Sequence, residues 1–229
     1  MSGPDFLREA PHVIVTRFSV PRPHDPKNSA SHTDESWLER RLELFRSFFV
    51  PSVGRLGVPA VLLCSGASAP AVGAALADLD WVEVVEQDDW YGGWLGEEGQ
   101  TLTRMDSDDA IHERWFDAVD AVSGDIQVCF TKAFLRYDLT NGKLAAYSRD
   151  VPSPLAAFKG GLNPYACDHA ALDQRFSARH IEGAFLLQVF HGGNVSTRRP
   201  SWYRRRLPLD RLDPFGVRDS VSTSKGRAV

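Results

Sequence analysis

The sequence has few cysteines, no long apolar run and no excess of basic residues, and each absence excludes a class of protein. Its three cysteines are widely spaced and form no CxxC pair, so a disulfide framework is excluded. No stretch approaches the roughly 20 apolar residues that a transmembrane helix needs. A formal net charge of −4 at pH 7 gives no indication of a nucleic-acid partner.

The cysteines and the first residues also bear on the cellular compartment. We interpret Cys64, Cys129 and Cys167 as buried thiols of a protein in a reducing environment. Residues 1–15 lack the basic segment followed by an apolar run that is typical of a signal peptide. We therefore expect a cytoplasmic protein without a transmembrane segment.

The pattern of apolar residues predicts alternating strands and helices in the first half of the chain. Apolar, partly β-branched runs predict buried strands at 12–20, 58–66 and 81–87. Helical patterns begin at Ser36 and Ala69, and Ser36 forms an S-x-x-E capping box. The first of these helices is expected to end or bend at Pro51. This alternation favours an α/β fold with a mixed, mostly parallel central sheet flanked by helices.

The second half of the chain predicts one more strand at 101–105, a helix over 110–122 and a hairpin. The hairpin is indicated by Asn141-Gly142 between two apolar runs. With 229 residues, the chain is long enough for one domain with a sizeable core. We expect a single domain over residues 1–200 and a basic, partly disordered tail over 201–229.

Polar residues follow several of the predicted strands. They are Thr16-Arg17, Cys64-Ser65-Gly66 and Asp106-Ser107-Asp108. Ligands of open α/β sheets bind beyond the carboxyl ends of the strands, so we expect these residues to line one common edge.

The acidic segment at 106–109 has two interpretations. Neighbouring carboxylates repel one another unless a cation or a donor neutralises them. Mg²⁺ is typically held by one or two carboxylates plus substrate phosphates, so Asp106 and Asp108 suit an ion that bridges the protein to a diphosphate. Alternatively, Asp108 or Asp109 caps the predicted helix and the charges complement its dipole. An EF-hand is excluded, because Ile111 and Asp117 occupy its glycine and glutamate positions.

Three separate segments resemble one family, the rhamnosyltransferase-like glycosyltransferases of bacteria. The first is VTRFSV with the later WLERRLELFRSFFVPSV, the second LTRMDSDDAIH, and the third LLQVFHGGNVSTR. The resemblance covers most of residues 12–199, and the segments occur in the family's order. The third segment departs from it, because Ala184-Phe185-Leu186 stands where the family usually begins with Trp.

The resemblance implies a GT-A-type, Rossmann-like domain that transfers a hexose, such as rhamnose, from a nucleotide sugar with the help of Mn²⁺ or Mg²⁺. The donor would be UDP-, GDP- or dTDP-linked, and the acceptor a glycan, a lipid-linked molecule or a protein. Asp106, Asp108 and His191 are the predicted metal ligands. The residues predicted to bind the donor are Thr16, Arg17, Arg104, Asp106, Ser107, Asp108 and Asn194.

Several of these residues have structural alternatives. Arg17 pairs with the diphosphate or stacks on the base, or else forms an ion pair with the acidic segment. His191 is either a ligand or a structural histidine, and Asp109 a third carboxylate or a helix cap. Trp90, Tyr91 and Trp94 form either a lid over a sugar or an anchored surface loop. The arginines at 198–206 form a site for a polyanionic acceptor or a membrane surface, or belong to a solvated tail.

An inverting transfer also needs a base that deprotonates the acceptor hydroxyl. Asp168, His169, His180 and Glu182 lie in a suitable part of the chain, and Asp168 and Glu182 are the preferred candidates. Two other functions stay open. One is a metal-dependent phosphatase or phosphotransferase with Asp106 as the nucleophile, and the other is a non-catalytic nucleotide-binding module.

Overall fold

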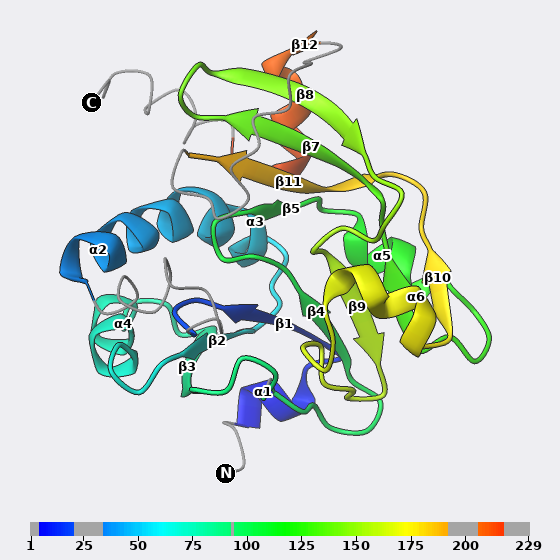
Figure 1. Ribbon diagram of the computed structural model, residues 1–229. Helices are drawn as coiled ribbons and strands as arrows, with labels where there is room; N and C mark the ends of the chain where they lie inside the picture. The colour runs from blue at the N-terminus through cyan, green and yellow to red at the C-terminus, as the bar shows by residue number, and fades with distance from the viewer. Residues whose placement is uncertain (1–4, 21–33, 93, 192–205, 218–229) are drawn as a thin grey trace.

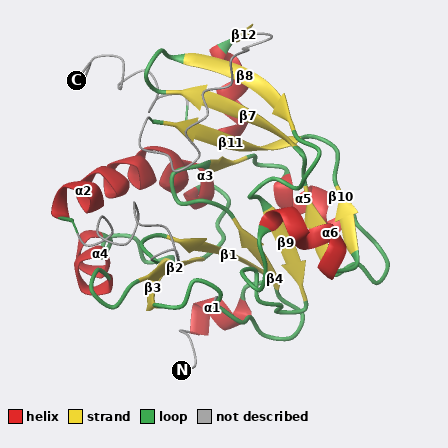
Figure 2. Cartoon of the chain, viewed as in Figure 1, coloured by secondary structure: helices red, strands yellow, loops and turns green. Residues whose placement is uncertain are grey.

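The computed structural model describes residues 5–20, 34–92, 94–191 and 206–217, which form two β-sheets with helices between and around them (Figures 1 and 2). The first sheet has the order β10-β6-β9-β4-β1-β2-β3, and only β9 runs against the other strands. Its strands are β1 (His12–Arg17), β2 (Ala60–Cys64), β3 (Val82–Glu86), β4 (Thr101–Arg104), β6 (Val128–Phe130), β9 (Ala156–Lys159) and β10 (Ala178–His180). The predicted mixed, mostly parallel sheet is therefore confirmed.

The second sheet was not expected from the sequence. It has the order β12-β8-β7-β11-β5, and in it β7 and β11 run parallel while the other neighbours are antiparallel. Its strands are β5 (Ala110–Ile111), β7 (Ala133–Asp138), β8 (Lys143–Ser148), β11 (Ala184–Phe190) and β12 (Arg206–Leu207). The predicted hairpin at Asn141-Gly142 joins β7 to β8, and Gly142 has the positive φ of +65° that such a turn requires.

A long helical segment lies between the two sheets (Figure 1). It consists of α2 (Glu35–Leu44), the π-helical turn η2 (Phe45–Phe49) and α3 (Val50–Gly54). The remaining helices are short: α1 (Asp5–Glu9), α4 (Ala69–Ala75), α5 (Trp115–Asp120), η3 (His169–Ala171), α6 (Leu172–Arg175) and η4 (Leu209–Phe215). Among the described residues, no helix has both the length and the apolar character needed to cross a membrane.

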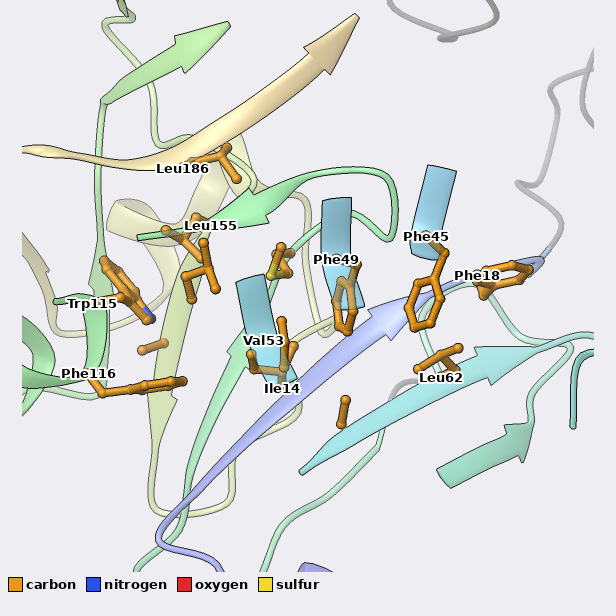
Figure 3. Close-up of a cluster of buried hydrophobic side chains, with 14 of the residues drawn as sticks. Ile14, Phe18, Phe45, Phe49, Val53, Leu62, Trp115, Phe116, Leu155 and Leu186 are labelled. Atoms are coloured by element: carbon orange, nitrogen blue, oxygen red, sulfur yellow. The ribbon is translucent and has the colours of Figure 1, made fainter. Parts of the chain in front are cut away.

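The helical segment buries apolar side chains on both sides, as its position between two sheets requires. Phe45, Phe49 and Val53 pack on Ile14 and Leu62 of the first sheet, and Figure 3 shows their side chains over β1 and β2. Leu44 and Phe48 belong to a second cluster with residues of β7, β8 and β11. Burial of each large apolar side chain contributes about 1.5–3 kcal/mol, so this segment joins the two sheets into one core.

The predicted helix over 110–122 is wrong in its first part. Residues 110 and 111 form β5, which pairs with β11, and α5 begins only at Trp115 with Arg114 before it. The acidic segment is therefore not the start of a helix, and Asp109 is not a helix cap. The apolar spacing that suggested a longer helix belongs to a short buried strand followed by a turn.

Part of the predicted tail belongs to the folded structure. Residues 206–217 add β12 to the edge of the second sheet and then form η4. Leu212, Phe215 and Val217 are buried against that sheet. The packing of these three apolar side chains explains why this stretch is ordered although its surroundings in the sequence are basic and polar.

Candidate active site

A cavity of about 860 Å³ lies where the carboxyl ends of β1 and β4 face α2 and the end of β11. This is the sheet edge at which ligands of α/β folds bind. Its charged lining is rich in arginine, in contrast to the acidic chain as a whole. The arginines and aspartates are Arg17, Arg40, Arg41, Arg104, Arg136, Arg149, Asp106, Asp108, Asp109 and Asp168.

Arg17, at the end of β1, is held between aromatic rings and the backbone. Its guanidinium carbon lies 3.3 Å from the ring centroid of Trp90 and 4.2 Å from that of Tyr165. One guanidinium nitrogen donates to the carbonyl oxygen of Trp90 at 3.0 Å. The Tyr165 hydroxyl accepts from the Arg17 amide and donates to the Val15 carbonyl, which fixes the ring beside β1. A guanidinium held in this way is preorganised to meet phosphate oxygens.

Arg104, at the end of β4, is a buried cation with spare donor capacity. Its Nη1 donates to the carbonyl oxygens of Pro164 and Cys167, at 2.8 and 2.9 Å. Its Nη2 is buried and has no hydrogen-bond partner among the described residues. Burial lowers the pKa of Arg104 to about 10, which leaves it charged at neutral pH. A buried guanidinium nitrogen without a partner indicates a ligand that completes it.

The two predicted D-x-D carboxylates have different surroundings. Asp108 is buried, and its Oδ2 accepts from Arg41 Nη1 at 2.8 Å and from His191 Nε2 at 2.9 Å. Burial alone raises the pKa of Asp108, but the Arg41 charge and the His191 hydrogen bond lower it to about 2. Asp106 is exposed within the cavity, and the crowding of protein around it and the Asp108 charge raise its pKa. Asp106 is thus the carboxylate of the motif that is exposed to the cavity.

Asp109 connects the acidic segment to the second sheet. Its Oδ1 accepts from the backbone amide of Val189 in β11 at 2.9 Å, whereas its Oδ2 is buried without a partner among the described residues. Burial and the charges of Asp108 and Asp106 raise the pKa of Asp109 well above its ordinary value. This residue therefore stabilises the junction of the sheets and is not the helix cap that the sequence suggested.

These donor atoms offer few ligands to a divalent ion. The described residues contain no group of three His, Cys, Asp or Glu side chains placed to share an ion. Asp108 Oδ2 and His191 Nε2 are directed at each other, so the predicted three-residue ligand set is not assembled. The Asp106 carboxylate faces the cavity, and Mg²⁺ is often held by one carboxylate plus phosphate oxygens and water. The residues fit an ion of that kind, held jointly with a ligand.

The two preferred base candidates, Asp168 and Glu182, lie in different parts of the structure. Asp168 is exposed and lines the cavity, next to His169. Burial, followed by the charges of Arg104 and Arg149, lowers the pKa of His169 to about 4, so its imidazole is neutral at pH 7. Glu182 lies before the start of β11, whereas the cavity is reached at the other end of that strand, about 20 Å away. The structure therefore places Glu182 away from this cavity, in a separate surface depression beside Phe185.

Other predicted residues also differ in placement. Thr16 and Ser107 are fully buried and do not line the cavity. Thr16 lies in β1 next to Arg17, so the two side chains point to opposite faces of the sheet. Of the aromatic loop, Trp90 lines the cavity, Trp94 packs on the core below the first sheet and Tyr91 is exposed. Asn194 and the basic stretch at 198–205 lie outside the described residues.

Four arginines of the cavity were not singled out from the sequence. Arg40 and Arg41 lie on α2, where Arg40 donates to the His191 carbonyl at 3.0 Å. Arg136 lies in β7 and Arg149 follows β8. Arg40 and Arg41 lie within the segment WLERRLELFRSFFVPSV but had no role assigned to them, and Arg136 and Arg149 belong to no motif. Helix and sheet packing brings the four together from distant parts of the chain. The only local signal is the interruption of an apolar strand by Arg136.

The comparisons with known proteins give a broad likeness. No protein-family model and no curated protein matches the chain. The inositol-1-phosphate CTP transferase of T. maritima aligns over 96% of this chain and 98% of its own, at 11% identity and a TM-score of 0.46. The 4-diphosphocytidyl-2C-methyl-D-erythritol synthase of Anaerococcus prevotii aligns over 82% and 90%, at 11% identity and a TM-score of 0.44. S. aureus TarS 1–349 aligns over 78% and 60%, at 12% identity and a TM-score of 0.38. The function proposed below rests on the cavity's own residues.

Proposed function

We propose that this protein is a glycosyltransferase that binds a nucleotide-sugar donor in the arginine-lined cavity and transfers a hexose to an acceptor. The observation that carries the proposal is the pair of arginines at the ends of β1 and β4. Arg17 is oriented by two aromatic rings, and Arg104 has a buried nitrogen without a partner. Planar cations of this kind recognise a diphosphate through charge-assisted hydrogen bonds.

The site also offers places for the rest of such a donor. Trp90 and Tyr165 supply aromatic surface for a base or a sugar. The donor is UDP-, GDP- or dTDP-linked, as the resemblance to the rhamnosyltransferase-like enzymes implies. Asp168, which is exposed in the cavity, is the candidate base for deprotonating an acceptor hydroxyl of a glycan, a lipid-linked molecule or a protein.

We also propose Mn²⁺ or Mg²⁺ as the cofactor, with Asp106 as its ligand from the protein. A divalent ion supplies Lewis-acid stabilisation of a departing diphosphate. Asp108 supports the site differently, because its ion pair with Arg41 fixes α2 beside the acidic segment. The phosphatase alternative, with Asp106 as nucleophile, would use the same cavity-facing carboxylate, so the two functions are distinguished by the substrate that is turned over.

The proposal is tested by the release of nucleoside diphosphate from UDP-, GDP- and dTDP-hexoses, with Mn²⁺ or Mg²⁺ and without acceptor. We expect one donor class to be hydrolysed slowly, and D106N to reduce the rate at least about 100-fold. The exposed Arg211 on η4 gives a control, since R211Q alters the charge far from the cavity.

Three results would contradict the proposal in different ways. Equal rates for D106N and wild type would remove Asp106 from the reaction. Binding of a nucleotide without turnover of any donor would favour a non-catalytic module. Turnover of a phosphoester without a nucleotide sugar would favour the phosphatase.

A further inference from the structure

The wall of the cavity formed by the second sheet carries a pair of arginines that the donor does not need. Arg136 lies in β7, and its Nε and Nη2 donate to Gln188 Oε1 in β11 at 3.1 and 2.5 Å. Its guanidinium carbon lies 4.8 Å from the ring centroid of Tyr147. Arg149 follows β8, with its guanidinium carbon 5.2 Å from the ring centroid of Phe134. Both side chains line the cavity.

These two cations are close together and have no carboxylate partner. Among the described residues, neither Arg136 nor Arg149 lies within ion-pair distance of an aspartate or glutamate. Burial and the charge of Arg136 both lower the pKa of Arg149, while Asp106 and Asp109 offset this only in part. Two partly buried guanidiniums that repel each other are stabilised most by an anion that both can contact.

The pair is distinct from the arginines assigned to the donor. Arg17 and Arg104 extend from the first sheet and lie near Trp90 and Tyr165, whereas Arg136 and Arg149 extend from the second sheet. His169 lies near both groups, since charges of Arg104, Arg149 and Arg17 act on it. If Arg17 and Arg104 hold the donor diphosphate, Arg136 and Arg149 remain available to contact the acceptor.

Building on the glycosyl transfer proposed above, we infer that Arg136 and Arg149 form an acceptor subsite for an oxyanion. The acceptor therefore carries a phosphate or a carboxylate near the hydroxyl that receives the sugar. The two guanidiniums provide fork-shaped donors that match the oxygens of either group. Gln188 fixes the plane of Arg136 and thereby orients the subsite.

The test uses inorganic phosphate and acetate as probes for the two possible oxyanions. Each is titrated by calorimetry into wild-type protein that is saturated with the nucleoside diphosphate it binds best. We expect one of the two anions to bind to this complex. We expect R149Q to lower the affinity for that anion at least about tenfold. R149Q is expected to change nucleotide affinity less than threefold. R17Q is expected to lower nucleotide affinity and to leave anion affinity nearly unchanged, and R211Q to change neither affinity.

A second variant protects the test against misfolding. Arg136 is buried, so R136K, which keeps the charge but loses the fork of donors, is used instead of a neutral residue. R136K is also expected to lower the affinity for the anion, while the melting temperature of the protein stays close to that of wild type.

The outcomes separate this inference from the proposed function. Failure of both anions to bind, or equal binding to R149Q, would overturn the subsite. A loss of nucleotide affinity in R149Q as large as that in R17Q would overturn it too, because the pair would then belong to the diphosphate. If no nucleotide binds but free protein binds the anion through Arg149, the proposed function fails and the oxyanion site remains. Preference for phosphate or acetate identifies the group on the acceptor.

Discussion

Asp106 and Asp108 are two residues apart in one motif, and their carboxylates have different surroundings. Asp108 pairs with Arg41, is hydrogen-bonded to His191 and holds three parts of the chain together. Asp106 faces the cavity and forms none of the ion pairs found among the described residues. In the proposed function, the contact with a ligand and the stability of the fold are therefore divided between two carboxylates of one motif.

This division predicts opposite results for the two amide variants. D108N is expected to lower the free energy of unfolding by about 1–3 kcal/mol, because the half-buried Arg41 and the buried His191 lose their anionic partner. D106N is expected to change it by less than about 0.5 kcal/mol, as an exposed position should. Urea denaturation of both variants measures this difference. Equal destabilisation by the two substitutions would contradict the assignment.

His169 is expected to make stability depend on pH. Its pKa of about 4 in the folded protein lies below the ordinary 6.5, so the unfolded chain takes up a proton first as the pH falls. The folded state therefore loses stability between pH 6.5 and pH 4, by up to about 3 kcal/mol, and loses no more below that range.

The measurement is the free energy of unfolding of wild type and H169Q at intervals from pH 7.5 to pH 4. The variant lacks this titration, so its curve should fall less steeply than that of wild type over the same interval. Parallel curves would show that His169 is not held neutral by burial and its arginine neighbours.

Among individual residues, many that line the cavity could be named from the sequence, but none of those contributed by β7 and β8. Arg17, Arg104, Asp106, Asp108, Asp168 and His191 all line the cavity, and all but Asp168 lie at or just after the carboxyl end of a strand. Arg136 and Arg149 could not be found, because their neighbours are defined by strand pairing and not by spacing in the chain. His191 was expected near Asp108 as a second metal ligand, but its direct contact with Asp108 and the ion pair with Arg41 were not predicted.

Among the elements, the helical segment from Glu35 to Gly54 has the largest influence on the site. It passes Pro51, where the sequence predicted an end or a bend. A proline ring clashes with the carbonyl four residues earlier in a regular helix. The wider turn η2 directly precedes it, with the Val50 amide bonded to the Phe45 carbonyl, and lets the segment continue.

The start of this segment predicts a link between helix stability and ligand binding. The cap is Asp34 and not Ser36, since the Asp34 carboxylate accepts from the amides of Ser36 and Trp37. Hydrogen bonds from Ser36 and Trp37 also lower the pKa of Asp34, so the cap is present above its ordinary range and is lost in acid.

D34A is expected to lower the melting temperature by a few degrees at pH 7 and by less at pH 3. It should also weaken nucleotide binding modestly, because α2 carries Arg40 and Arg41 into the cavity. D150A, which removes an exposed carboxylate in a loop, is the matched control. A melting temperature of D34A that equals that of D150A at both pH values would show that the cap contributes nothing.

In the whole molecule, the cavity exists because two sheets meet. Four strands of the first sheet, β1 to β4, follow from local patterns and were predicted within a few residues, whereas its other three strands were not predicted individually. The second sheet depends on the parallel pairing of β7 with β11, about 50 residues apart, and on η4 near the end of the chain. Such pairings are decided by tertiary packing, which a single sequence does not encode locally.

The central claim is that this cavity holds a nucleotide, and a thermal-shift titration tests it most directly. Wild type and R17Q are melted with UDP, GDP and dTDP, each with and without Mn²⁺. At a hundredfold excess over Kd, a ligand stabilises the folded state by about 2.7 kcal/mol. We predict a rise in melting temperature for one nucleotide in wild type, larger with Mn²⁺, and a much smaller rise in R17Q. An unchanged melting temperature with every nucleotide, in a protein that melts cooperatively, would contradict the account.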